Sequence, residues 1–343
     1  MGRTRQRHWQ QSKTCSNGAL ASIDGYQQVV QETIEKQLEI IGVPLGFGAG
    51  KSGSELGAEA IRHSPIRGSR VTRHLEQLGF KVTDRGNVTL VQPADGQRVS
   101  GDIHNLAEIA ASSENIATEV MGALGRGATP VILGGDHSIA IGSFSGISTH
   151  FKQRGEDIGL IWFDAHADIN TPETSTSGNI HGMPLAAILG HGAEELVNVA
   201  SAGAKLDPRF FAHIGARDID PGEREMIEKL GLRDRFFTMS DIDKRGMMAC
   251  VEDAIRIAGA APAGFAVTFD VDMIDPRFAP GSGTLVRGGT TYREAHLALE
   301  LIAESGKMRS FEIVEVNPLL DQSNLTVELA CELILSAFGK TIL

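Results

Sequence analysis

The chain has 343 residues, of which 41% are hydrophobic, which is enough for a large buried core, and its formal net charge is -11. It has neither the dense Lys/Arg run of a nucleic-acid-binding face nor an apolar run near the ~18 residues of a membrane span, so we expect neither partner. Three cysteines (Cys15, Cys250 and Cys331) without a CxxC pair favour a reducing compartment, and we expect the cytoplasm.

Residues 1–35 are predicted to be an N-terminal extension and residues 36–343 a single catalytic domain. The first 23 residues contain four basic residues, Arg3, Arg5, Arg7 and Lys13, and no acidic residue. Such a composition is typical of a flexible terminus or of an organellar transit peptide, and both interpretations stay open. No Pro/Gly/Ser linker divides the remaining sequence, which favours one domain.

Short apolar runs alternate with helical patterns along this domain. Each run is apolar on both faces, which predicts strands covered by helices on both sides. The predicted strands are residues 38–44, 80–86, 130–135, 158–164, 210–216, 235–239, 264–272 and 309–316. The predicted helices are residues 105–124, 223–230, 247–258, 291–305 and 324–338. This alternation predicts a three-layer α/β/α fold with a mostly parallel, doubly wound sheet of eight strands.

In such sheets the ligand site lies beyond the carboxyl ends of the strands. Three of the predicted strands end in possible metal ligands, within the sequences GGDHSIA, DAHADIN and DVDMIDP. Alternate residues of an extended chain point to the same side, so DxHxD and DxD each present converging side chains. The candidate residues are Asp136, His137, Asp164, His166, Asp168, Asp270, Asp272 and Asp275.

Converging carboxylates repel one another unless cations lie between them. Imidazole and carboxylate ligands favour Mn²⁺, with Co²⁺, Ni²⁺ or Fe²⁺ as substitutes. Six protein ligands are too many for one catalytic ion with an open position, whereas two ions could share them and ionise a bridging water. The glycine-rich stretch at residues 46–53 resembles a phosphate-binding loop, but Leu45 stands where that motif requires glycine.

GGDHSIA, DAHADIN, SGNIHGMP, FDVDMIDP and EVNP, in this order and spacing, resemble the arginase branch of the ureohydrolase family. The resemblance covers residue 38 to the C-terminus and implies the single-domain fold that arginases share with deacetylases. It implies two Mn²⁺ ions per subunit, and it leaves Asp136 and Asp275 as supporting or turn residues. The implied metal ligands are His137, Asp164, His166, Asp168, Asp270 and Asp272.

By the same resemblance, His181 is the catalytic histidine and moves a proton to the departing amine. Glu315 is the carboxylate that holds the guanidinium group. Asp168 belongs to the catalytic residues as well as to the ligands. The family match also extends to the loop after the second metal motif, where Asn170 and Ser177 are expected to hold the substrate's α-carboxylate.

Two further segments match arginases in the same way. In ARDIDPGE, Asp220 is expected to bind the α-ammonium group, with Asp218 supporting it. Thr284 is expected to line the pocket. Ala167, Leu285 and Arg287 depart from the residues usual in the family.

The resemblance therefore predicts hydrolysis of L-arginine to L-ornithine and urea by a hydroxide that bridges two metal ions. The alternatives left open are agmatine, another guanidino acid or formimidoylglutamate as substrate, a single-zinc deacetylase of the same broad fold, and a non-catalytic metal-stabilised protein. By analogy with the family, we expect a homotrimer or homohexamer.

Overall fold

Residues 36–94 and 103–342 are described in the computed structural model, and the predicted extension at residues 1–35 lies outside them. All eight strands belong to one sheet, in the order β2-β1-β3-β8-β7-β4-β5-β6, and every neighbouring pair is parallel. The strands are β1 (Gln37–Gly42), β2 (Lys81–Asn87), β3 (Thr129–Leu133), β4 (Gly159–Phe163), β5 (Phe211–Ile214), β6 (Phe236–Phe237), β7 (Phe265–Asp270) and β8 (Met308–Val314). The predicted single α/β domain with eight strands is confirmed.

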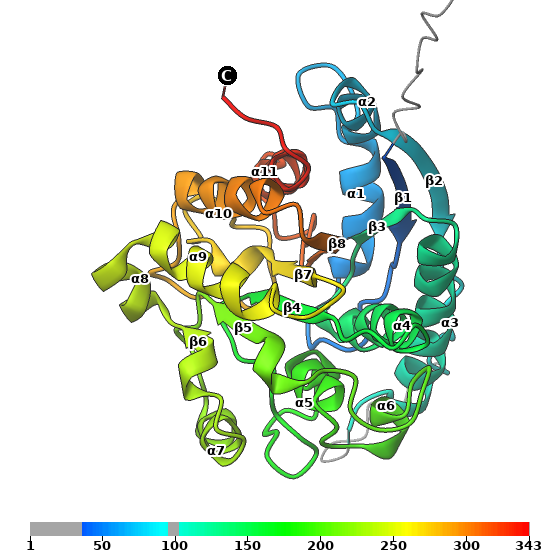
Figure 1. The fold of residues 1–343 in the computed structure, drawn as a ribbon, viewed down its shortest axis with the longest axis vertical. Coiled ribbons are helices and arrows are strands. Elements are labelled where there is room, and N and C mark those ends of the chain that lie inside the picture. The colour runs from blue at the N-terminus through cyan, green and yellow to red at the C-terminus, as the bar shows by residue number, and fades with distance from the viewer. Residues whose placement is uncertain (1–35, 95–102, 343) are drawn as a thin grey trace, which may run out of the picture. The chain divides into compact units, whose positions relative to one another are not determined.

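Helices cover both faces of the sheet (Figure 1). One face packs against α1 (Gly57–His63), α2 (Val71–Gln77), α8 (Met239–Arg245), α9 (Met247–Ala258), α10 (Tyr292–Glu304) and α11 (Leu325–Ala337). The other packs against α3 (Leu106–Gly125), α4 (Ala140–Lys152), α5 (Pro184–Ile188), α6 (Glu194–Val197) and α7 (Pro221–Lys229). All five predicted helices are present, and α1, α2, α4, α5, α6 and α8 were not predicted.

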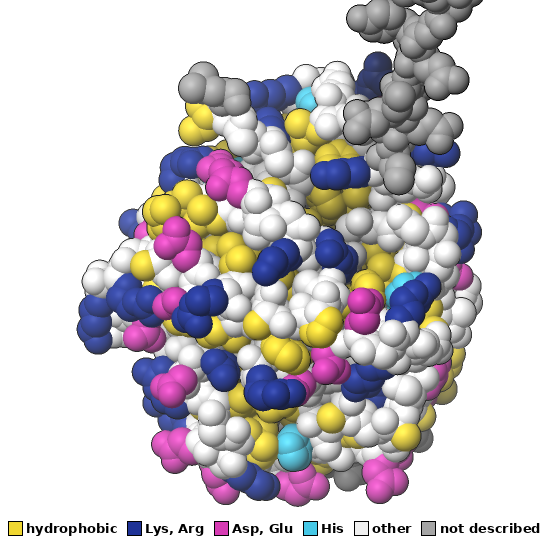
Figure 2. All heavy atoms as spheres, viewed as in Figure 1, with side chains coloured by type: hydrophobic (Ala, Val, Ile, Leu, Met, Phe, Trp, Pro, Cys, Tyr) yellow, Lys and Arg dark blue, Asp and Glu magenta, His cyan; other side chains and the backbone are white. Residues whose placement is uncertain are grey.

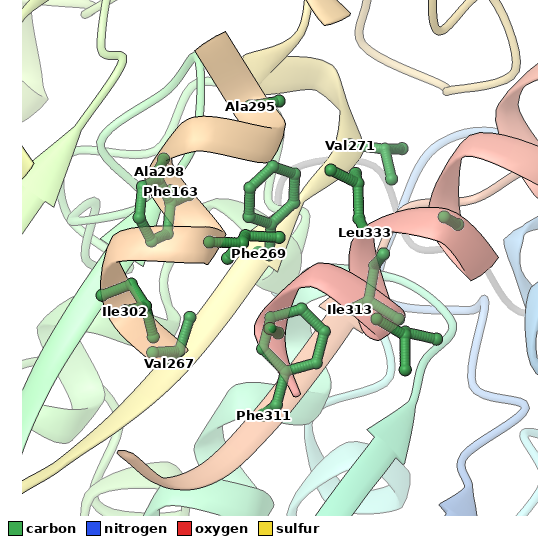
Figure 3. Packing of buried hydrophobic residues seen from close by; sticks show 14 of the residues in the cluster. Phe163, Val267, Phe269, Val271, Ala295, Ala298, Ile302, Phe311, Ile313 and Leu333 are labelled. Atoms are coloured by element: carbon green, nitrogen blue, oxygen red, sulfur yellow. The ribbon is translucent and has the colours of Figure 1, made fainter. Parts of the chain in front are cut away.

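The strand β8 lies in the middle of the sheet, between β3 and β7, although it is the last strand along the chain (Figure 1). Side chains of alternate residues on β7 and β8 enter the core between the sheet and α10 and α11 (Figure 3). Phe269 and Phe311 are two of the fully buried rings in this layer. The adjacent carboxyl ends of these strands therefore have a rigid base.

One expectation about the strands was wrong. Residues 80–86 were predicted to be buried on both faces, but six of the seven residues of β2 are exposed. β2 is an edge strand, hydrogen-bonded only to β1 in the sheet, and its polar residues Lys81, Asp84 and Arg85 face solvent. The apolar residues Phe80 and Val82 only partly reach the core.

The outer surface mixes charges of both signs, with Lys/Arg and Asp/Glu side chains interspersed on the face drawn in Figure 2. In residues 36–94 and 103–342, no helix combines the length and the apolar character needed to cross a bilayer.

Candidate active site

The first group of possible ligands surrounds one ring nitrogen of His137, which follows β3 at the start of a 3₁₀ turn. The Nδ1 atom of His137 lies 3.0 Å from Asp164 Oδ2, 3.0 Å from Asp168 Oδ2 and 3.4 Å from Asp270 Oδ2. This nitrogen is buried and has no hydrogen-bond partner of good geometry. An imidazole nitrogen that faces three carboxylates without a well-directed hydrogen bond is the arrangement of a set of metal ligands.

A second group shares Asp164 with the first. The Nδ1 atom of His166 lies 3.1 Å from Asp272 Oδ2 and 3.4 Å from Asp164 Oδ1. The ligand atoms of each trio, His137/Asp164/Asp168 and Asp164/His166/Asp272, lie within 4.8 Å of one another. With Asp270 beside the first trio, the structure brings all six predicted ligands together in two adjacent sets joined by one carboxylate.

The backbone reaches this arrangement by a different route from the one expected. Continued strand geometry was expected to align the DxHxD residues, but β4 ends at Phe163 and Asp168 has a left-handed φ of 53°. The turn is held locally, because the backbone N–H of His166 donates to Asp164 Oδ1 at 2.7 Å. The side chains converge through a tight turn at the strand tip.

Burial makes this cluster electrostatically unfavourable without cations. Burial and the neighbouring Asp164 raise the pKa of Asp168 to about 7. Burial and Asp272 raise the pKa of Asp270 well above its usual value. The cluster therefore holds protons unless other positive charges replace them, and this is the property expected of a site for divalent cations.

His181 and Glu315 lie together beside the cluster. His181 Nδ1 is 3.1 Å from Glu315 Oε1, and the same oxygen accepts a hydrogen bond from the backbone N–H of His137 at 2.9 Å. Burial alone would lower the pKa of His181, but the carboxylates of Glu315, Asp136 and Asp168 together outweigh it and raise the pKa to about 9. Although burial opposes it, His181 lowers the pKa of Glu315. The pair is a protonated imidazole against a carboxylate.

Two adjoining cavities open onto these residues. The inner one, of about 200 Å³, is lined by residues that include Asp168, Asn170, Asp220, Glu223 and Asp270. The outer one, of about 540 Å³, is lined by residues that include Lys51, Leu285 and Glu315. Both are lined by His166, His181, Asp218 and Thr284. A small molecule in either cavity therefore lies beside His181 and the His166 side of the cluster.

The inner cavity holds a hydrogen-bonded group at the start of α7. Asn170 Nδ2 donates to Asp220 Oδ2 at 2.7 Å, and Thr174 Oγ1 donates to Asn170 Oδ1 at 2.8 Å. Asp220 caps α7 by accepting from the N–H of Glu223, whose carboxylate in turn accepts from the N–H of Asp220. Glu223 was not among the predicted site residues, and the D-P-G-E pattern of a capping box was the only local signal for it.

The other predicted substrate residues differ in position. Asp218 is exposed and lines both cavities. Thr284 Oγ1 donates to Asp272 Oδ2 at 3.0 Å, which ties the pocket wall to the metal cluster. Ser177 is exposed, accepts from the N–H of Asn179, and does not line either cavity.

The two remaining acidic residues hold turns, as predicted. Asp136 accepts from the N–H groups of Ser138 and Gly48. Asp275 accepts from the N–H groups of Arg277 and Gly288. The glycine-rich loop also supports the site directly, because the N–H of His181 donates to the carbonyl of Gly48 at 3.2 Å.

Comparison with known proteins identifies the family that the sequence motifs resemble. The Arginase family model matches residues 36–339. The chain belongs to the arginase family. Its curated relatives include the arginase of Brevibacillus brevis, to which it is 41% identical over 310 residues, covering 90% of this chain and all of that protein. The arginase of Staphylococcus aureus strain MRSA252 is 42% identical over 314 residues, covering 91% of this chain and all of the relative.

Solved structures of arginases share the fold. The native Bacillus caldovelox arginase superposes with a TM-score of 0.82 at 39% identity, and the match covers 90% of this chain and all of that chain. The Entamoeba histolytica arginase, solved with L-ornithine, superposes with a TM-score of 0.80 at 29% identity over 89% of this chain and 99% of the other. The arginase-like region therefore begins at the first described strand and extends nearly to the C-terminus.

Proposed function

We propose that this arginase-family chain hydrolyses L-arginine to L-ornithine and urea with the aid of two divalent cations. The observation that carries the proposal is the convergence of His181 and Glu315 on a cavity that opens onto two ligand sets sharing Asp164. Relatives that are called arginases and are about 40% identical support arginine as the substrate. A purely structural metal site would not need the His181–Glu315 pair in a solvent-accessible cavity.

The donor groups fit a pair of Mn²⁺ ions. His137, Asp164, Asp168 and Asp270 would hold one ion, and Asp164, His166 and Asp272 the other, with carboxylates shared between them. Four carboxylates and two imidazoles form an oxygen-rich set, which suits Mn²⁺ better than softer metals. When bound, the two ions would lower the pKa of a water molecule and so supply hydroxide at neutral pH.

Glu315 would orient the guanidinium group. Oε1 is occupied by His137 N–H and His181, and no residue of 36–94 or 103–342 is hydrogen-bonded to Oε2, which would therefore serve the substrate. A carboxylate pairs well with a planar guanidinium through charge-assisted hydrogen bonds. This contact would place the electrophilic carbon next to the metal cluster.

His181 would deliver a proton to the departing amine. Its pKa of about 9, raised by Glu315, Asp136 and Asp168 against the effect of burial, keeps the ring protonated at neutral pH. Cleavage of the C–N bond requires a proton on the leaving nitrogen, because an amide anion is a very poor leaving group. The ring is only partly exposed and lines both cavities, so it is within reach of a bound substrate.

The amino acid head group would occupy the inner cavity. Asp218, Asp220 and Glu223 form an acidic wall for the α-ammonium group. Asn170 is already hydrogen-bonded to Asp220, so it would contact the α-carboxylate only by sharing its amide group. Ser177 would need to turn from its contact with the N–H of Asn179 to reach the same carboxylate.

We further propose that the protein acts in the cytoplasm as a homotrimer or homohexamer. The scarcity of cysteines supports the location, and the family supports the assembly. Light scattering on the purified protein tests the assembly directly, and a mass near the 36.6 kDa of one chain would contradict it.

One assay tests the substrate. The Mn²⁺-loaded protein is offered arginine, agmatine and 4-guanidinobutyrate side by side, and urea release is measured. We expect a clear preference for arginine. A preference for agmatine would assign the chain to another activity of the family, and no urea from any of the three would indicate a non-catalytic protein.

A further inference from the structure

Two polar side chains lie side by side on the central strands beneath the metal cluster. Thr268 on β7 and Glu312 on β8 are register partners, and their exposed fractions are only 3% and 2%. Most residues around them on this face of the sheet, such as Ala266 and Trp162, are apolar and belong to the core packed against α3 and α4. The polar exceptions near Glu312 are the buried hydroxyls of Ser310 and Ser143. Burying a carboxylate in such surroundings costs folding free energy unless the carboxylate has a hydrogen-bond partner.

The two side chains form a hydrogen-bonded chain that ends on His137. The Oγ1 atom of Thr268 donates to Glu312 Oε1 at 2.8 Å and lies 3.0 Å from His137 Nε2. The opposite ring nitrogen, Nδ1, is the one that faces Asp164, Asp168 and Asp270. The chain of contacts therefore runs from a buried carboxylate through a hydroxyl group to a predicted metal ligand.

The direction of these hydrogen bonds determines the tautomer of His137. The Thr268 hydroxyl has one proton, and when it donates that proton to Glu312 it can only accept from His137 Nε2–H. The proton of a neutral imidazole is then on Nε2, and the lone pair is on Nδ1. The reverse direction would put the proton on Nδ1, where it would block coordination.

We propose that Thr268 and Glu312 are positioning residues that hold His137 in its metal-binding tautomer and orientation. The inference rests on the proposed function, because it assumes that His137 binds an ion. The ring has little freedom to compensate, since it also stacks on Trp162 with centroids 4.3 Å apart. Partners of this kind also make a histidine ligand more basic, and their loss commonly weakens metal affinity 10- to 100-fold.

The test compares two substitutions of Thr268. Thr268→Val keeps the shape of the side chain and removes the hydroxyl, whereas Thr268→Ser keeps the hydroxyl. Mn²⁺ dissociation constants are measured by competition with a fluorescent chelator. We expect Thr268→Val to weaken the binding of one of the two ions about 10- to 100-fold. The affinity of Thr268→Ser for both ions should stay within about twofold of that of the unchanged protein.

The same strand offers a matched control. Ser310 lies two residues before Glu312 on β8 and is equally buried, and its hydroxyl has no hydrogen-bond partner among the described residues. Ser310→Ala removes a buried hydroxyl outside the chain of contacts, and we expect no change in metal affinity. Glu312→Gln keeps an acceptor for Thr268 and loses the negative charge, so we expect its affinity to lie between those of the unchanged protein and Thr268→Val.

Several results would overturn the inference. It fails if Thr268→Val binds both ions as tightly as the unchanged protein, or if Thr268→Ser and Ser310→Ala weaken binding as much as Thr268→Val. If Thr268→Val does not fold, as judged by circular dichroism, Glu312→Gln decides, and unchanged affinity there would also overturn it. Failure of the proposed function is distinguishable, because the unchanged protein would then either bind no pair of ions or show no preference for arginine in the urea assay, and neither result involves Thr268.

Discussion

Two residues of the candidate site, Asp168 and Glu315, have left-handed backbones, with φ angles of 53° and 62°. This conformation is uncommon outside glycine and costs of order 1–3 kcal/mol where it is enforced. Hydrogen bonds hold it in place, since Glu315 N–H donates to the carbonyl of Gly135 and Leu185 N–H to that of Asp168. The backbone is strained where the side chains must point at one spot, which is typical of functional sites.

Glu315→Gln tests the negative charge at the proposed guanidinium position while keeping the shape of the side chain. The amide keeps an oxygen for the N–H of His137 and the same backbone, but it loses the charge. Hydrogen bonds to charged groups contribute about 1.5–3 kcal/mol, so kcat/KM for arginine should fall roughly 10- to 150-fold. Urea release measures the effect. Metal content should be unchanged, and a loss of activity that merely follows a loss of metal would refute the role.

The sequence alone was sufficient to place in the site those residues that come at or just after the strand ends. His137, Asp164 and Asp270 could be placed together because the tips of neighbouring parallel strands share one edge of a sheet. Glu223 could not be placed in the site from the sequence, because its burial depends on how α7 packs over the inner cavity. The pairing of Asn170 with Asp220 was equally hidden, since it joins two loops fifty positions apart in the chain.

At the scale of elements, helix α7 links stability to pH through the buried carboxyl group of Glu223. Burial raises the pKa of Glu223 to about 8, from the 4.5 expected in an unfolded chain. Between these pH values the folded protein binds more protons than the unfolded one, so its stability falls as the pH rises. Below about pH 4.5 both states are protonated, and this contribution no longer changes.

Glu223→Gln should therefore remove part of the pH dependence of unfolding. In the metal-free protein, urea denaturation from pH 5 to 8 should show the unchanged protein losing stability relative to the variant by up to about 1.4 kcal/mol per pH unit. Glu225→Gln, at an exposed position of the same helix, is the control and should leave the slope unchanged. Parallel pH profiles for all three proteins would contradict the prediction.

The packing of α3 against α4 depends on glycines. A Cβ atom on Gly146 would lie 2.6 Å from the carbonyl oxygen of Ala117, whereas one on Gly125 would meet nothing within 4 Å. Gly146→Ala should destabilise the protein by about 1–3 kcal/mol through overpacking. Gly125→Ala should be neutral or stabilising by up to about 1 kcal/mol. Thermal unfolding of both variants checks the pair, and equal melting temperatures would refute the argument.

The same two helices show which kind of helix could be predicted from the sequence. α3 has a polar face and an apolar face at helical spacing, so its pattern was visible. α4 was missed because its sequence, AIGSFSGISTHFK, is rich in glycine, serine and β-branched residues, and its first eleven residues are buried all round. The apolar residues of α4 repeat at helical spacing about as clearly as those of α3, so its low intrinsic helix propensity is what hid it, and tertiary packing supplies the stability instead.

For the molecule as a whole, the acidic cluster should make folding stability depend on metal. An ion that binds only the folded state stabilises it by about 2.7 kcal/mol when its concentration is 100 times the dissociation constant. Chelation should therefore abolish urea release and lower the melting temperature by several degrees, and added Mn²⁺ should restore both. Calorimetry against Mn²⁺ concentration measures this, and an unchanged melting temperature would argue against the site.

The order of strands has a consequence for synthesis on the ribosome. Among the described residues β8 is the last strand along the chain, yet it lies between β3 and β7 and so joins the two halves of the sheet. While Met308–Val314 is still inside the exit tunnel, the emerging polypeptide can pair β1, β2 and β3, or β4 to β7, but it cannot close the sheet. A nascent chain should thus acquire enzymatic competence only after Met308–Val314 has emerged, and a chain that stops before Met308 should yield no active fragment.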